Sequence, residues 1–121
     1  MSNHRSQYRF VKVSDDTMFP TFAEGCLIVI DQTVRRVGFS GIYAFEDDNG
    51  SVMIRRVDIR LDGSALCQCD SIFYPDCEIV PPELIERLTV AGLYVADIRF
   101  ATKELAHDII RHVMERTGQA Q

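Results

Sequence analysis

Closely spaced turn signals separate short β-prone segments along most of this chain. Residues 47–50 (Asp-Asp-Asn-Gly) and 61–64 (Leu-Asp-Gly-Ser) are typical of hairpin turns, because glycine accepts the positive φ angles that tight turns require. Between them, residues 52–59 are rich in the β-branched and apolar side chains that favour strands. The middle of the chain is therefore predicted to form antiparallel sheet, with residues 52–59 pairing back across the first turn.

Further segments of the same character extend this pattern in both directions. The expected strands are residues 8–13, 26–30, 41–45, 52–59, 65–69, 78–80 and 88–100. Gly92 interrupts the last of them and marks a bend or bulge. Ser14, Asp15 and Asp16 supply turn or cap chemistry and favour a short helical turn that starts at Thr17. The fold class that follows is mainly β, a barrel or sandwich with a C-terminal helix.

The period of the apolar residues changes near the end of the chain. After Thr102, a suitable N-cap, apolar residues follow a helical spacing at Leu105, Ala106, Ile109, Ile110, Val113 and Met114. The stripe packs either on the sheet of its own domain or in an interface with a second copy or another protein. For the second case the candidate interface residues are Leu105, Ile109, Val113 and Tyr94.

Length and charge limit the organisation and the partners. The chain has 121 residues, which suits one domain. We expect a flexible N-terminus at residues 1–7, the folded domain at residues 8–100, and the amphipathic helix with its tail at residues 101–121. With 13 basic and 18 acidic residues the net charge is −5, which argues against direct binding to a phosphate backbone.

The four cysteines are expected to act as small apolar side chains. Cys67 and Cys69 lie two residues apart in a predicted strand, and the three histidines lie near the chain ends, so the spacing does not favour a metal site. No cofactor is implied. No apolar run approaches the roughly 20 residues of a membrane-spanning helix, and no signal peptide precedes the domain. These features predict a cytoplasmic protein with reduced thiols and no membrane partner.

Two segments and their neighbours resemble a known family. Residues 15–22 read Asp-Asp-Thr-Met-Phe-Pro-Thr-Phe, residues 52–57 read Val-Met-Ile-Arg-Arg-Val, and residues 69–75 read Cys-Asp-Ser-Ile-Phe-Tyr-Pro. In this order and spacing they resemble the C-terminal domain of LexA-type and lambda-type repressors, whose fold UmuD and the signal peptidases share. The resemblance covers residues 8–100 and implies a LexA-like or signal-peptidase-like β fold.

The positions that carry catalysis in the family are substituted here. The family's nucleophilic serine corresponds to Thr17, in a motif with Asp16, Met18 and Pro20, and its lysine base corresponds to Arg55. A lysine acts as base once burial lets it lose its proton, whereas a guanidinium stays charged in proteins. The resemblance therefore implies a pseudo-peptidase, in which Arg55 pairs with Asp15, Asp16 or a carbonyl.

The expected function is a non-proteolytic regulatory and dimerisation domain of a phage-type or stress-response (SOS) transcriptional regulator. In related repressors this domain dimerises, so we expect a homodimer that reaches DNA only through an attached or partner DNA-binding head. Two alternatives stay open, a slow hydrolase or autoprotease that uses Thr17, and a UmuD-like accessory subunit. A further reading is that the cleft binds a partner's peptide, such as that of a full-length repressor, without cutting it.

Overall fold

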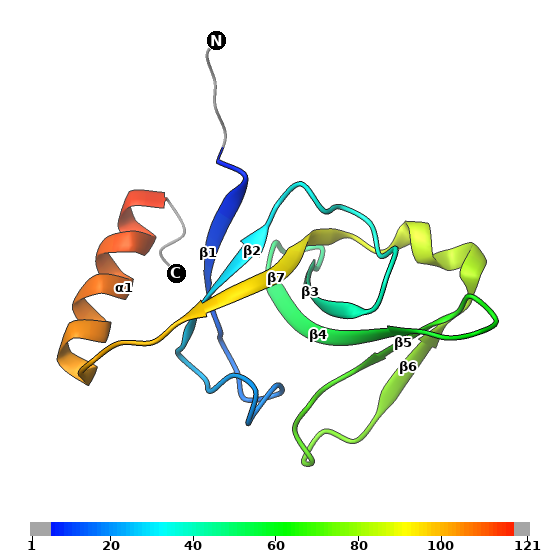
Figure 1. Cartoon of the computed structure of the whole chain (residues 1–121), viewed down its shortest axis with the longest axis horizontal. Helices are drawn as coiled ribbons and strands as arrows, with labels where there is room; N and C mark the ends of the chain where they lie inside the picture. Colours follow the sequence, from blue (N-terminus) through cyan, green and yellow to red (C-terminus); the bar gives the residue numbers. More distant parts are fainter. Residues whose placement is uncertain (1–5, 118–121) are drawn as a thin grey trace, which may run out of the picture.

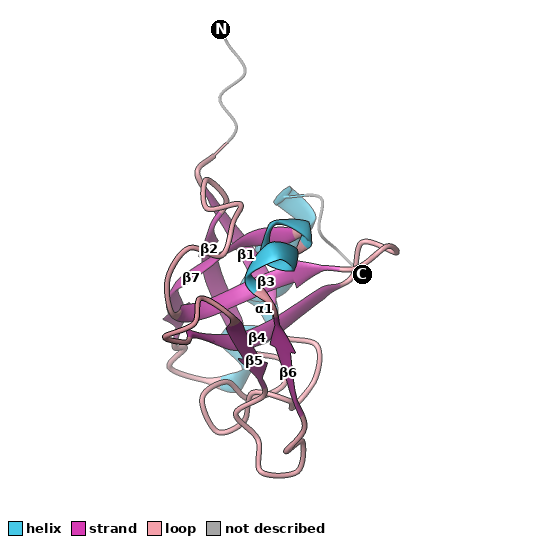
Figure 2. Ribbon diagram, turned by 90° about the vertical axis from the view of Figure 1, so that its right-hand side faces the viewer, coloured by secondary structure: helices cyan, strands magenta, loops and turns pink. Residues whose placement is uncertain are grey.

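A single antiparallel sheet makes up most of the protein in the computed structural model, which describes residues 6–117. Strands form the body of the protein, and the helices lie at its periphery (Figures 1 and 2). The strands are β1 (Tyr8–Lys12), β2 (Leu27–Asp31), β3 (Gly41–Glu46), β4 (Val52–Ile59), β5 (Ala65–Gln68), β6 (Cys77–Val80) and β7 (Val90–Ile98). A 3₁₀ helix, η1 (Pro82–Arg87), precedes β7, and α1 (Lys103–Thr117) follows it.

The sheet is open rather than closed into a barrel. Its strand order is β1-β2-β7-β3-β4-β5-β6, and in the described part of the chain the edge strands β1 and β6 each pair on one side only. The prediction of a mainly β fold with a C-terminal helix is thus confirmed. The two predicted hairpin turns are also present, with Gly50 at φ 82° and Gly63 at φ 87°.

Local differences from the predicted elements have local causes. The helical turn expected at Thr17 is absent, and residues 15–22 instead form hydrogen-bonded turns, including Phe19 N–H to Asp16 C=O at 3.2 Å. Cys69 lies outside β5, because the chain leaves the sheet after Gln68. Helix η1 was not predicted, although Pro82 occupies its first turn, where a missing N–H costs nothing.

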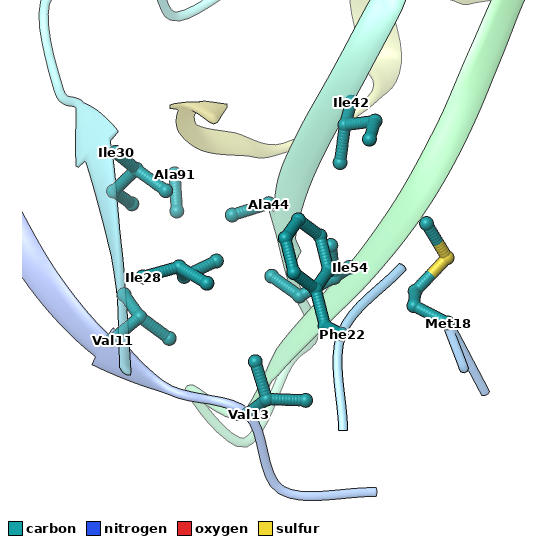
Figure 3. Close-up of a cluster of buried hydrophobic side chains, with 10 residues drawn as sticks. All are labelled: Val11, Val13, Met18, Phe22, Ile28, Ile30, Ile42, Ala44, Ile54 and Ala91. Atoms are coloured by element: carbon teal, nitrogen blue, oxygen red, sulfur yellow. The ribbon is translucent and has the colours of Figure 1, made fainter. Parts of the chain in front are cut away.

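Two buried apolar clusters form the core. Figure 3 shows the first, in which side chains from β1, β2, β3, β4 and β7 meet Met18 and Phe22 of the 15–22 turn. The second lies around Tyr43 and includes Phe45, Val57 and Val80. Because Met18 is fully buried, the 15–22 turn is fixed to the sheet by packing.

Helix α1 lies beside β1, at the end of the molecule opposite the β5–β6 hairpin (Figure 1). The Thr102 hydroxyl accepts a hydrogen bond from Leu105 N–H at 3.0 Å, which is the predicted N-cap. Of the predicted N-terminal tail, Ser6 and Gln7 contact the end of β2, and residues 1–5 lie outside the described residues, as do residues 118–121 after the helix. No helix among the described residues has the length and apolar content needed to cross a membrane.

Candidate functional site

Thr17 and Arg55, separated by 38 positions in the sequence, lie within hydrogen-bonding distance of each other. Arg55 Nη1 donates to Thr17 Oγ1 at 3.2 Å and to its neighbour's carbonyl, Ile54 C=O, at 2.7 Å. Thr17 is buried and Arg55 is half-buried. Of the partners expected for Arg55, a backbone carbonyl is the one observed. Neither Asp15 nor Asp16 forms an ion pair with Arg55.

The hydroxyl of Thr17 donates its only hydrogen to a carboxylate. Asp15 Oδ1 accepts from Thr17 Oγ1 at 2.7 Å and from Thr17 N–H at 3.1 Å. The same pair of bonds joins Asp31 to Thr33 and Asp62 to Ser64, at turns far from this site. The Asp15–Thr17 contact is therefore a recurring Asp-x-Thr/Ser turn, whose role is to hold the backbone.

Among the described residues, the Thr17 hydroxyl has a carboxylate that accepts its hydrogen and a guanidinium that donates to its oxygen. Arg55 donates to the oxygen and has no lone pair with which to take a proton. Lys12 is exposed on β1 and makes no hydrogen bond to Thr17, and the side chain of Lys103 lies outside the described part. Of the two hydrogen bonds of the hydroxyl, the one to Asp15 lies within the 15–22 turn and the one from Arg55 joins that turn to β4.

The loop at residues 69–76 is held against the 15–22 turn. Ser71 N–H donates to Thr17 C=O at 3.0 Å, and the Tyr74 hydroxyl donates to Asp16 Oδ1 at 2.8 Å. This hydrogen bond, together with the charge of Asp16, raises the pKa of Tyr74. Asp16 thus positions the loop, and the two segments form one unit around Thr17.

Arg56 and Asp70 form a two-bond ion pair in this unit. Arg56 Nε and Nη2 donate to the two carboxylate oxygens of Asp70, each at 2.8 Å. Asp70 also accepts from the Thr21 hydroxyl at 2.5 Å, and these bonds, chiefly the one from Arg56, lower its pKa. The sequence analysis did not predict this pair, although Asp70 belongs to the segment that carries the resemblance.

The other two residues of the motif have structural positions. Met18 is fully buried in the first core cluster, and Pro20 is exposed in the turn. Neither Met18 nor Pro20 forms a hydrogen bond with Arg55. Their role in the described structure is to shape the turn that presents Thr17.

An open cleft of about 620 Å³ adjoins Arg55, and we call it the β6 cleft. It is formed by β3 to β6, the 69–76 loop and residues 87–89. Apolar side chains supply much of its wall, including Phe45, Met53, Phe73, Tyr74 and Leu88. Its charged residues are Arg55, Arg87, Glu46, Asp76 and Glu78. The adjoining loop also exposes Ile72 at 84% and Phe73 at 80%, which is unusual for large apolar side chains.

Three of the four cysteines, Cys67, Cys69 and Cys77, line this cleft. Burial is the main cause that raises the pKa of Cys67, and the charge of Glu78 adds to it against the opposing effect of Arg55. The protonated thiol is a weak nucleophile. Within residues 6–117, no group of three or more His, Cys, Asp and Glu side chains could hold a metal ion.

The predicted interface residues fall in two separate places. On α1, Leu105 is 45% exposed, and Ile109 and Val113 are half-buried beside β1. Tyr94 instead packs edge-on against Phe22, with ring centroids 4.8 Å apart. Burial, followed by the hydrogen bond to Asp97, raises the pKa of Tyr94 to about 12. The structure therefore places Tyr94 on β7 at the edge of the first core cluster, whereas the other three residues belong to α1.

Comparison with known proteins found neither a matching family model nor a similar curated protein.

Proposed function

We propose that this chain is a LexA-type regulatory domain that lacks peptidase activity and serves dimerisation within a transcriptional regulator. The observation that carries the proposal is the 3.2 Å hydrogen bond from Arg55 to Thr17, which joins the two positions where the resemblance implies a catalytic lysine and serine. The mainly β sheet with its buried Met18 is compatible with the LexA-like and signal-peptidase-like fold that the proposal includes.

The polar geometry supports the loss of catalysis. Peptide cleavage by a hydroxyl requires a base that accepts its proton in a position to pass it to the leaving group. At Thr17 the acceptor is Asp15, in a turn contact that recurs at Asp31 and Asp62, and Arg55 is a donor only. The added methyl group of threonine further restricts the rotation of its hydroxyl.

The exposure of apolar side chains on α1, beside edge strand β1, supports a role in assembly. None of the described apolar side chains of the α1 stripe is fully buried, and β1 beside it is an edge strand. A second copy that covers this stripe would remove apolar area from water, which stabilises association by about 25 cal/mol per Å². With a net charge of −5, the domain would reach DNA through another head.

Two other functions compete with this proposal. A hydrolase that uses Thr17 would need Asp15 as its base, since Asp15 is the group that accepts the hydroxyl proton. A UmuD-like accessory subunit would share the fold and the pairing of two copies but would work without a DNA-binding head. We rank both below the regulatory domain, because the first conflicts with the polar geometry and the second adds no observation of its own.

Sedimentation equilibrium over a wide concentration range tests the dimer. We expect the full chain to form a dimer that Leu105→Glu or Ile109→Glu weakens by about tenfold or more, because each places a charge in an apolar interface at a cost of about 1.4 kcal/mol or more. His112→Glu, on the exposed face of α1, is the matched control and should leave the dimer unchanged.

A monomer at every concentration would reject the assembly function. A dimer that is unaffected by both Leu105→Glu and Ile109→Glu would support the assembly function but would show that the interface does not include the α1 stripe. Circular dichroism of each variant shows whether the sheet is intact.

A further inference from the structure

The β6 cleft contains two cationic side chains that have no acidic partner. In the described part of the chain, the ion pairs involve Arg36 with Glu86, Arg56 with Asp70, and Arg111 with Asp108, whereas Arg55 and Arg87 line the cleft without one. Arg87 is exposed, but Arg55 is half-buried beside apolar walls. A charge in such surroundings interacts more strongly with a ligand than one in open water.

Two nitrogens of the Arg55 guanidinium remain available to donate hydrogen bonds to a ligand. Its Nη1 bonds to Thr17 Oγ1 and Ile54 C=O, while Nε and Nη2 have no acceptor among the described residues. A guanidinium edge with two free donors matches the two oxygens of a carboxylate. Asp15 does not fill this place, because it is connected to Arg55 only through the Thr17 hydroxyl.

The remaining charges of the cleft limit how acidic a ligand can be. Asp76 and Glu78 are exposed at the cleft, and Glu46 is half-buried there. They repel a segment with several carboxylates, so the cleft favours one carboxylate at Arg55 and apolar groups elsewhere. The apolar walls at Met53 and Phe73 provide the complementary surface for those groups.

The edge of the sheet at this cleft favours an extended chain as the ligand. Strand β6 pairs with β5 on one side and has no strand on its other side within residues 6–117. Cys77, Glu78 and Val80 of this edge strand line the cleft. A free strand edge offers backbone donors and acceptors to an extended peptide.

We propose that the β6 cleft binds an extended peptide segment of a partner protein, in which apolar residues flank a single Asp or Glu that pairs with Arg55. This binding site goes beyond the proposed dimerisation, because α1 and β1 lie at the opposite edge of the sheet. The substituted residue at position 55 thereby gains a role in recognition, one that a neutral lysine could not fill.

A random octapeptide library displayed on phage and selected against the immobilised full chain tests the proposal. We expect enrichment of peptides that carry one Asp or Glu between apolar residues. The most enriched sequence, synthesised with a fluorophore, and its Glu→Gln or Asp→Asn counterpart are then compared by fluorescence anisotropy. The amide version should bind about tenfold more weakly or worse, since one charge-assisted contact of this kind is worth at least about a factor of ten.

Variants of the protein locate the contact. Arg55→Gln should abolish the preference for the acidic peptide. Arg60→Gln, which removes an exposed charge just after the end of β4 and outside the cleft, should preserve it. Arg87→Gln should weaken the acidic peptide about fivefold or less and leave the amide peptide unchanged, as expected for an exposed charge. Because the acid-to-amide change is made in the peptide, the result stays decisive even if Arg55→Gln lowers protein stability.

Three outcomes would overturn the inference: no enriched peptide, an enriched motif without a carboxylate, or equal binding of acidic and amide peptides. Sedimentation reports on dimerisation independently, so failure of the peptide site and failure of the dimer can be told apart.

Discussion

Arg55 and Arg56 are adjacent in the sequence, yet they have different partners within the unit formed by the 15–22 turn and the 69–76 loop. Successive side chains of a strand point to opposite faces of the sheet. Arg56 consequently meets Asp70 in a two-bond ion pair, while Arg55 meets the neutral Thr17 hydroxyl and faces the β6 cleft. The pairing of one arginine leaves the other available for a ligand.

Restoring the family's residue pair should restore reactivity at Thr17. In the double variant Thr17→Ser with Arg55→Lys, an amine that can lose its proton replaces a group that only donates. We expect labelling by a fluorophosphonate probe at least about tenfold above that of the parent chain, rising with pH as the amine is deprotonated. Intact-mass spectrometry after timed exposure measures the adduct.

Thr17→Ala with Arg55→Lys is the matched control and should not react. Equal labelling of the parent chain and the double variant would contradict the assignment of Thr17 as an inactive position.

At the scale of elements, β7 holds the sheet together, because it lies between β2 and β3. Its pairing shifts register against β2 between Val29 and Ile30, and against β3 between Ala44 and Phe45. Gly92 lies in the stretch between these shifts and pairs with Ala44. The bend predicted at Gly92 thus corresponds to two register shifts, one in the pairing of β7 with β2 and one in its pairing with β3. At Gly92 itself β7 lies close to the backbone of β2.

Gly92→Ala should destabilise the fold, because its Cβ would lie 2.8 Å from Asp31 C=O and 3.0 Å from Ile30 Cδ1. The carbonyl belongs to a paired strand and cannot move away cheaply, so we expect a loss of about 1–3 kcal/mol in the free energy of unfolding. Urea denaturation followed by circular dichroism measures it.

Gly38→Ala is the control, since its Cβ would have no atom within 4 Å. It should change stability by less than about 1 kcal/mol. Equal stability of the two variants would mean that β2 and β7 can separate without cost.

At the scale of the whole molecule, the open sheet places two surfaces at its two ends. The α1 stripe lies next to edge strand β1, and the β6 cleft lies at the other edge. The cleft is lined by strands β3 to β6, so β2 and β7 lie between it and edge strand β1, and occupation of one surface leaves the other accessible. A domain with this arrangement can pair with a second copy and hold a partner peptide at the same time.

Stability of the whole molecule should fall in acid. Hydrogen bonds lower the pKa values of Asp31, Asp62 and Asp70 in the folded protein, the first two mainly through Thr33 and Ser64 and the third mainly through Arg56. A carboxylate with a lowered pKa stabilises the folded state above its unfolded pKa of about 4, and this contribution is lost as the pH falls through the folded pKa. The melting temperature should therefore drop below about pH 4.

Asp70→Asn should lower the melting temperature at neutral pH and flatten this acid dependence, because it removes one of the titrating groups. Loss of the charge-assisted bonds from Arg56 should cost about 1–3 kcal/mol. Asp48→Asn, an exposed loop change without a described hydrogen bond, is the control. An unchanged acid slope in Asp70→Asn would show that this carboxylate titrates alike in the folded and unfolded chain.

The sequence by itself determined the positions of the seven strands and of the C-terminal helix in the described part of the chain. The turn glycines at positions 50 and 63 predicted the observed bounds of β4, and the apolar spacing after Thr102 predicted the position of α1. Both signals are local, because the first depends on backbone conformation and the second on periodicity. The candidate pair Thr17 and Arg55 also followed from the sequence, through the resemblance of the segments that contain them.

Only the tertiary structure decided what these elements build. An open rather than closed sheet, the Arg56–Asp70 ion pair and the β6 cleft all depend on how strands curve and on which loops meet. Local signals contain no information on such contacts, since residues 56 and 70 meet only after β4, β5 and the 69–76 loop have packed together. Tyr94 shows the same dependence, because its edge-on packing on Phe22 joins β7 to the 15–22 turn only in the folded chain, while its place in an interface stays a prediction.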